Sequence, residues 1–327
     1  MMRAIILLAL FLLASCSTPP AGTEVVVPIP SVSQTQEVVL QTLTGQIHGT
    51  LLVPSGESPK PVALIIAGSG PTDRNGNTKG LPGSNDSLKM LAESLAANGI
   101  ASLRYDKRGI AASGGAAAAE ADLRFDHYVE DAAAWVRQLK SDSRFSTVTV
   151  IGHSEGSLIG MIAARTAEAD GYVSIAGAGR SAPEILRAQL KPQLPPELWL
   201  ESERILNGLI EGKVSGSVPP SLAALYRESV QPYLISWFAY DPAAEVARLE
   251  MPVLLVQGTT DIQVSEEDVG MLRRAAPSAE VAIIEGMNHV LKIVDADRGR
   301  QVASYSDPSL PIARELEDRI VAFIRRL

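Results

Sequence analysis

The stretch at residues 148–161, with the sequence VTVIGHSEGSLIGM, constrains the fold of this chain more than any other. Its first half is a short β-branched run of the kind that fills a buried parallel strand, and its second half has apolar residues at helical spacing. A strand that enters a helix through one residue, Ser154, holds that residue in a strained backbone with its side chain exposed. Gly152 and Gly156 lack side chains, which allows the turn to pack tightly. The pattern predicts a serine hydroxyl beside the free N–H groups of a helix N-terminus.

Short apolar runs and helical patterns alternate along the rest of the chain. This alternation predicts an α/β fold, with a doubly wound, mostly parallel sheet that begins with an antiparallel hairpin. The expected strands are residues 38–43, 46–53, 62–67, 100–104, 148–151, 171–175, 252–257 and 281–284, and the expected helices are residues 87–98, 125–139, 156–166, 266–275 and 312–327.

The composition of the chain limits the classes of function that it can have. A chain of 327 residues with 46% hydrophobic content can bury one large core. The formal net charge of −8 argues against a nucleic-acid partner. His, Cys, Asp and Glu form no cluster with metal-ligand spacing, so the sequence implies neither a metal nor an organic cofactor.

One segment, residues 181–245, interrupts the alternation between two core strands. It has no clear strand, and its pattern is helical with proline breaks, which predicts a helical cap over the C-terminal edge of the sheet. Two roles for its aromatic residues stay open: lining a ligand pocket, with Trp237 and Phe238 as the candidates, or fastening the cap to the core. The aromatic residues of the segment are Trp199, Tyr226, Tyr233, Trp237, Phe238 and Tyr240.

A serine nucleophile needs a base in contact with it, and the chain offers four histidines. His289 follows the last expected strand and therefore lies at the edge of the sheet where Ser154 emerges. His153 ends the strand before Ser154, and alternation along a strand turns its side chain away from that of Ser154. His48 lies in the hairpin and His127 opens a helix on the flank of the sheet. We therefore expect His289 to be the base.

The acid that orients this base should follow an earlier core strand at the same edge. The run QGTTD delivers Asp261 in a loop after the strand at residues 252–257, which gives the chain order Ser, acid, His. The rivals in the sequence are Glu285, Asp295 and Asp297. Glu285 belongs to the strand end that carries the histidine loop, and the other two come after the histidine. We expect Asp261 to stabilise the imidazolium.

An oxyanion formed at Ser154 would need hydrogen-bond donors. One is the backbone N–H of Glu155, directly after the nucleophile. A second is expected from the loop after the strand at residues 62–67, which reads GSGPTDR, and there we expect the N–H of Ser69. The glycines of this loop permit close approach, although they could equally serve only the turn.

Five motifs in this order resemble a group of bacterial α/β-hydrolases identified as carboxylesterases, close to the serine aminopeptidase-like hydrolases. The likeness covers residues 36–327 and implies the α/β-hydrolase fold, the triad roles for Ser154, Asp261 and His289, and the oxyanion roles for Ser69 and Glu155. The chain departs from that superfamily at Ala67, where a histidine is common. The motifs are GSGPTDR at 68–74, RYDKRG at 104–109, GHSEG at 152–156, QGTTD at 257–261 and NHV at 288–290, with PYLISWF at 232–238 of the cap.

The N-terminus resembles a bacterial lipoprotein signal. An apolar run at residues 4–13 is too short to span a membrane and ends in LASC, whose cysteine, Cys16, is the single cysteine of the chain. The resemblance implies cleavage of a signal peptide at residues 1–15, lipidation of Cys16, a tether at residues 16–35 and a bacterial cell-envelope location. Ser17 favours the outer membrane over the inner one. The alternative is an ordinary signal peptide with an incidental cysteine.

These observations lead us to expect a membrane-anchored serine hydrolase that cleaves small carboxylic esters with short or medium acyl chains, through an acyl-enzyme on Ser154. The same triad also cleaves amides and thioesters, so a peptidase, an amidase or a thioesterase is an alternative. A non-catalytic envelope lipoprotein that keeps the fold is a further alternative. The intact set of Ser154, Asp261 and His289 argues against it.

Overall fold

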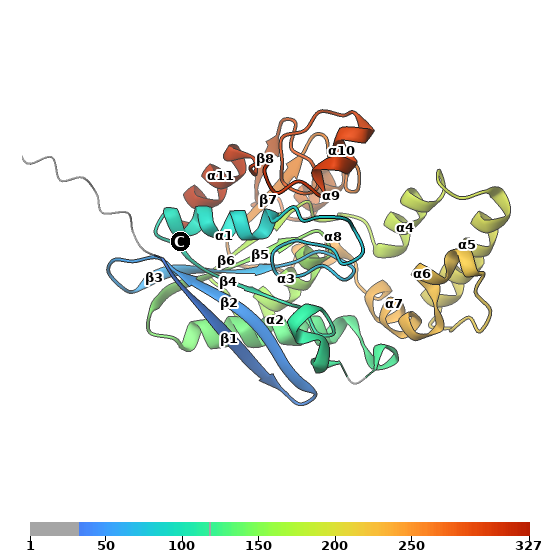
Figure 1. The fold of residues 1–327 in the computed structure, drawn as a ribbon, viewed down its shortest axis with the longest axis horizontal. Helices are drawn as coiled ribbons and strands as arrows, with labels where there is room; N and C mark the ends of the chain where they lie inside the picture. The colour runs from blue at the N-terminus through green and yellow to red at the C-terminus, as the bar shows by residue number, and fades with distance from the viewer. Residues whose placement is uncertain (1–32, 118) are drawn as a thin grey trace, which may run out of the picture. The chain divides into compact units, whose positions relative to one another are not determined.

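The computed structural model describes residues 33–117 and 119–327, and this part of the chain contains one eight-stranded sheet (Figure 1). The strand order is β1-β2-β4-β3-β5-β6-β7-β8. β2 pairs antiparallel with β1 and β4, and the other neighbours are parallel. The predicted doubly wound, mostly parallel sheet is confirmed. The strands are β1 (Gln34–Thr42), β2 (Gly45–Val53), β3 (Lys60–Ile66), β4 (Ala101–Tyr105), β5 (Phe145–His153), β6 (Gly171–Ile175), β7 (Val253–Gly258) and β8 (Glu280–Ile284).

The chain enters the sheet through the predicted antiparallel hairpin of β1 and β2. β1 begins at Gln34, so the last two residues of the expected tether already belong to the sheet. The expected signal peptide at residues 1–15, the lipidation site Cys16 and most of the tether lie outside the described residues. Within residues 33–117 and 119–327, no helix has both the length and the apolar character that a membrane span requires.

The order of the central strands determines where a ligand can bind. The chain places β4 on one side of β3 and then returns to place β5 on the other side. The loops that follow β3 and β5 therefore separate, and in open α/β sheets ligands bind in the crevice at such a switch point. The register pairs Ile66 with Gly152 near the ends of these strands. The loop after β3 therefore starts beside Ser154.

Helices cover both faces of the sheet because strand side chains alternate between two apolar clusters. Along β3, Ala63 and Ile65 belong to the cluster that includes α1 (Ser87–Ala97) and α11 (Arg314–Ile324), whereas Val62 and Leu64 belong to the other. The cluster that contains Val62 and Leu64 is covered by α2, α3 and α9. Figure 1 shows α1 and α2 on opposite sides of the sheet. These helices are α2 (Phe125–Ser141), α3 (Glu155–Thr166) and α9 (Glu266–Ala275), and the short α10 (Arg298–Ser304) precedes α11.

Between β6 and β7 the chain forms helices, and we call the segment from α4 to α8 the cap. Its buried residues Leu206, Tyr226 and Leu234 belong to the same apolar cluster as α2 and α3, so the cap has no separate core. Figure 1 shows α4 to α7 beside the sheet. The helices are α4 (Ala182–Leu190), α5 (Pro196–Ile210), α6 (Ala223–Tyr226), α7 (Gln231–Phe238) and α8 (Pro242–Val246).

Candidate active site

Ser154 connects β5 directly to α3, and its backbone has φ 55° and ψ −122°. A non-glycine residue with positive φ is strained, and such strain persists only where the surrounding structure holds it. The two flanking glycines provide that packing. A Cβ on Gly152 would overlap the carbonyl oxygen of Gly156, and a Cβ on Gly156 would overlap that of Ile66. The predicted strained turn is therefore confirmed, and it depends on the absence of both side chains.

His289 and Asp261 form a buried pair at the same edge of the sheet. Asp261 lies in the loop after β7 and His289 in the loop after β8, and the histidine Nδ1 lies 2.8 Å from the carboxylate Oδ2. A carboxylate can only accept here, so Nδ1 carries a proton, and in the neutral imidazole Nε2 then has the free lone pair. The side chains are 6% and 1% exposed, which excludes most of the competing water.

The environment of Asp261 keeps its carboxylate ionised. Burial alone would raise its pKa, but the imidazole of His289 and the backbone N–H groups of Gln263 and Val264 hold the pKa below the ordinary value. Those two N–H groups donate to Oδ1 at 2.7 and 3.0 Å. The acid is thus fixed in position through one oxygen and bonded to His289 through the other.

His153 is also part of this arrangement. Its ring lies 4.8 Å from the ring of His289, and its Nε2 donates to the backbone carbonyl of His289 at 2.8 Å. Burial, followed by the neighbouring His289, lowers the pKa of His153 to about 3, so this ring stays neutral. Among the described residues, the hydroxyl of Ser154 makes no hydrogen bond to His289. In enzymes without bound substrate this bond is often long or absent.

Both expected oxyanion donors are available. Glu155 is the first residue of α3, and Ser69 lies in the loop after β3. Within the part of the chain that the structure describes, neither backbone N–H donates to a protein acceptor. A Cβ on Gly68 would lie 3.2 Å from the Cβ of Ser154, so the loop that carries Ser69 approaches the nucleophile closely.

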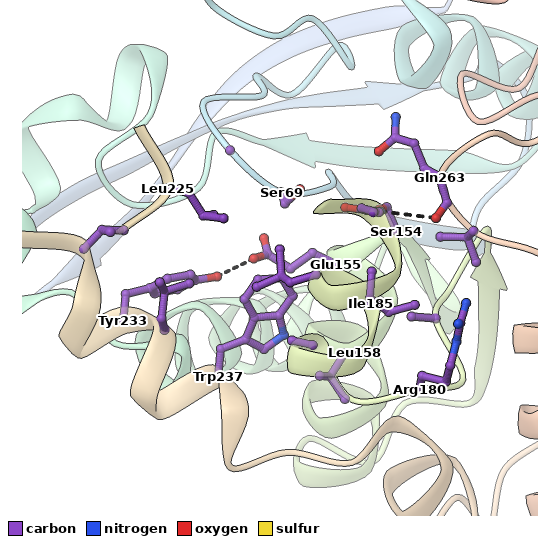
Figure 2. Close-up of a pocket in the computed structure, with 18 of the residues that line it drawn as sticks. Ser69, Ser154, Glu155, Leu158, Arg180, Ile185, Leu225, Tyr233, Trp237 and Gln263 are labelled. Atoms are coloured by element: carbon purple, nitrogen blue, oxygen red, sulfur yellow. Dashed lines mark hydrogen bonds between the residues drawn. The ribbon is translucent and has the colours of Figure 1, made fainter. Parts of the chain in front are cut away.

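The side chain of Glu155 forms a buried cluster that sequence reasoning missed. Its carboxylate accepts from the ammonium of Lys107 at 2.7 Å. It also accepts from the hydroxyl of Tyr233 in the cap, as Figure 2 shows. Burial and the nearby carboxylate raise the pKa of Tyr233 well above its ordinary value. Lys107 lies in the motif RYDKRG, so its presence was visible, but its partners are far away in the sequence.

A cavity of about 380 Å³ opens over Ser154, Ser69 and Glu155 (Figure 2). Apart from Ser69, Ser154, Glu155 and the Tyr233 hydroxyl, its wall is mostly apolar, with Arg180, Gln189, Arg227 and Gln263 as polar exceptions, and Arg227 is paired with Glu120. Arg180 is bonded to Asp268 at 2.7 Å and so is not an unpaired charge. The apolar lining includes Leu158, Ile185, Leu186, Leu225, Val230, Leu234 and Trp237.

The two aromatic candidates in the cap differ. Trp237 lines the cavity and also stacks on Phe125 of α2, at 6.2 Å between ring centroids and 5° between planes. Phe238 does not line the cavity, so that expectation was wrong. Its ring packs against Trp237 instead, because successive helix residues point about 100° apart. Both roles considered for the aromatic residues therefore occur in Trp237.

Arg74 and Arg108, the arginines of the motifs GSGPTDR and RYDKRG that lie next to acidic residues, have structural partners. Arg74 bonds to Asp106 at 3.0 Å and to Glu37 at 2.9 Å, and Arg108 bonds to Asp131. His48 is on β2, and His127, in the first turn of α2, accepts a hydrogen bond from the backbone N–H of Arg124. Neither histidine lines the cavity over Ser154. In the described ranges, no group of three or more His, Cys, Asp or Glu side chains could hold a metal ion.

Comparison with known proteins finds similarity to serine hydrolases and esterases. The family model described as "Serine aminopeptidase, S33" matches residues 79–231, which include Ser154. The chain is 29% identical over 248 residues to Esterase EstD of Thermotoga maritima. The match covers 75% of this chain and 58% of that protein, so the chain spans less than two thirds of the length of this curated relative.

Solved structures with the same architecture cover almost the whole chain. Est1E from Butyrivibrio proteoclasticus, solved with ferulic acid bound, superposes with a TM-score of 0.61 at 18% identity, covering 89% of this chain and 100% of the other. The α/β hydrolase GrgF from Penicillium sp. sh18 has a TM-score of 0.58 at 19% identity, covering 90% and 98%. At such identities the likeness is one of fold.

Proposed function

We propose that this chain, which has the α/β-hydrolase fold, cleaves carboxylic esters through an acyl-enzyme on Ser154. The observation that carries the proposal is the buried bond between Asp261 and His289 at the edge of the sheet where Ser154 stands strained and exposed to the cavity. The similarity to Esterase EstD supports the same activity.

The proposed reaction has two halves. The Ser154 oxygen attacks the ester carbonyl while Nε2 of His289 takes the hydroxyl proton, and Asp261 stabilises the resulting imidazolium. The N–H groups of Ser69 and Glu155 hold the tetrahedral oxyanion. His289 returns the proton to the leaving alcohol, which leaves the acyl group on Ser154. His289 then takes a proton from water, whose hydroxide attacks the acyl carbonyl, and returns the proton to Ser154 as the acid leaves.

The cavity favours an ester over the substrate of an aminopeptidase. Among the described residues that line it, Glu155 carries the single carboxylate, and that group is already bonded to Lys107 and Tyr233. A free α-ammonium group would therefore find no unpaired acid to bind. The apolar wall instead fits a short or medium acyl chain.

A panel of p-nitrophenyl esters of graded acyl length, run beside aminoacyl amides and acyl-CoA thioesters, tests this proposal. We expect turnover of the esters and stoichiometric labelling of Ser154 by a fluorophosphonate probe. Faster cleavage of the amides or thioesters would contradict the ester assignment. Absence of both turnover and labelling would favour a non-catalytic lipoprotein.

Truncating Trp237 to alanine is expected to move the acyl-length optimum toward longer chains, because it lengthens the apolar cavity. Each further methylene buried is worth about 0.8 kcal/mol, or about fourfold in kcat/KM. Phe238→Ala is the matched control, because it removes a neighbouring aromatic residue that does not line the cavity. The same ester panel, with melting temperatures, should show a shifted optimum for Trp237→Ala alone. Equal losses on every ester in both variants would mean that Trp237 only fastens the cap.

We further propose that the protein is anchored to the cell envelope through a lipid on Cys16, in the outer membrane rather than the inner one. The support is the apolar run at residues 4–13 followed by LASC. Cys16→Ser is expected to move the protein from the membrane pellet to a soluble or unprocessed form, because one lipid-bearing residue holds it there. Fractionation followed by immunoblotting measures this. Wild-type protein that is released without detergent would contradict the anchor.

A further inference from the structure

Lys107 is a buried cation that the proposed chemistry does not use. It lies just after β4, and its side chain is 1% exposed. Its ammonium donates to the Glu155 carboxylate at 2.7 Å and to the backbone carbonyl of Gly68 at 2.6 Å, and lies 4.9 Å from the ring centre of Tyr128. A buried charge is costly unless it is fully paired, and it adds little stability even then. Its position therefore calls for another explanation.

The contact with Gly68 determines the direction of an N–H group. The carbonyl of Gly68 and the N–H of Ser69 belong to one planar trans peptide, so they point in opposite directions. Lys107 holds the carbonyl on the buried side, and the N–H of Ser69 is thereby turned away from Lys107. In the part of the chain covered by the structure, that N–H has no protein acceptor, and Ser69 lines the cavity together with Ser154.

The contact with Glu155 reaches the second donor. Glu155 follows the nucleophile directly, and its own N–H is the other expected oxyanion donor. One ammonium thus joins the loop after β3 to the first turn of α3. It also neutralises a carboxylate that would otherwise oppose negative charge developing at Ser154. Through Tyr233, which donates to the same carboxylate, the cap helix α7 is connected to this cluster.

We propose that Lys107 is the positioning residue of the oxyanion hole. Its ammonium orients the Gly68–Ser69 peptide and fixes it relative to Glu155, so that both backbone N–H groups face the substrate oxygen. It also polarises that peptide, which strengthens the Ser69 N–H as a donor. This inference rests on the proposed function. It assigns a role to a residue that touches neither substrate nor nucleophile.

The test compares two double variants that each replace a buried ion pair by uncharged residues of similar size. Lys107→Met with Glu155→Gln removes the proposed device without leaving a buried charge unpaired. Arg108→Met with Asp131→Asn is the matched control, because this neighbouring pair is also buried but contacts neither Gly68 nor Glu155. The readouts are kcat and KM for a p-nitrophenyl ester, melting temperature, and the inhibition constant of an alkyl trifluoromethyl ketone relative to that of the matching methyl ketone.

We expect the first double variant to lose about 10²-fold in kcat with little change in KM, as when one oxyanion donor is removed. Its selectivity for the trifluoromethyl ketone, whose adduct carries an oxyanion, should fall in parallel. The control double variant should keep wild-type kcat and wild-type selectivity for the trifluoromethyl ketone, whatever its melting temperature. If the first double variant is folded and retains kcat and inhibitor selectivity close to those of wild type, the proposal is overturned.

If that double variant does not fold, Lys107→Met carries the same test, because it removes the donor to the Gly68 carbonyl. A fall in kcat and inhibitor selectivity at an unchanged KM supports the proposal, and wild-type values of both overturn it. Wild-type turnover of the ester is measured first. Its absence would reject the proposed function, whereas the ratio of variant to wild type judges Lys107 alone.

Discussion

Replacing Ser154 or His289 by alanine is expected to lower kcat for ester hydrolysis by about 10⁴-fold or more. Ser154→Ala removes the nucleophile, and His289→Ala removes the Nε2 that takes its proton. The two losses should not add in the double variant, because each disables the same step. The measurement is kcat on a p-nitrophenyl ester, with residual activity checked by fluorophosphonate labelling.

His153→Ala is the control for this prediction, because it removes the other imidazole at the site. That ring is neutral, with a pKa of about 3, and its Nε2 donates to the backbone of His289. We expect a lower melting temperature and a much smaller loss of kcat than in His289→Ala. Near-normal turnover in His289→Ala would contradict the assignment of His289 as the base. An equally large loss of kcat in a folded His153→Ala would contradict it as well.

Asp261→Asn is expected to lower kcat by about 10⁴-fold near neutral pH. The amide oxygen can still accept from the N–H groups of Gln263 and Val264, so the loop should keep its shape. The amide nitrogen, however, donates toward Nδ1 of His289. That bond moves the ring proton to Nε2, where it abolishes the base. The measurement is kcat together with the melting temperature.

Asp295→Asn provides the matched control for the acid. Asp295 was a rival in the sequence, but its side chain is 53% exposed and pairs with Arg300 on the surface. We expect its kcat to match that of the wild type. An equal loss in both variants, or none in Asp261→Asn, would contradict the assignment of the acid.

The fold and the position of the candidate triad could be predicted because both follow from local patterns. A β-branched run, two glycines around Ser154 and an apolar helix face specify the turn within a few residues. Parallel strands end at one edge of the sheet, so Asp261 and His289 could be placed near Ser154 from the order of the strands alone. Their catalytic roles remain predictions.

The contacts that were missed depend on residues distant in the sequence. Lys107 meets Gly68 and Glu155, which are 39 and 48 positions away. Arg108 likewise bonds to Asp131 on α2, which is 23 positions away. Helical spacing identifies the buried face of α7, yet it could not tell Trp237 from Phe238, because the choice depends on how the cap rests on α2.

The cap has no core of its own, which affects both the thermal unfolding of the domain and the evolution of its specificity. Tyr233 and Trp237 contact Phe125 of α2, and the buried residues of α5 and α7 continue the apolar cluster of the sheet. Unfolding of the cap would expose that cluster, so we expect cap and sheet to melt in one cooperative transition. A cap substitution that changes specificity is therefore expected to lower the free energy of unfolding of the whole domain. The number of such substitutions that the domain can accept is limited by its total free energy of unfolding.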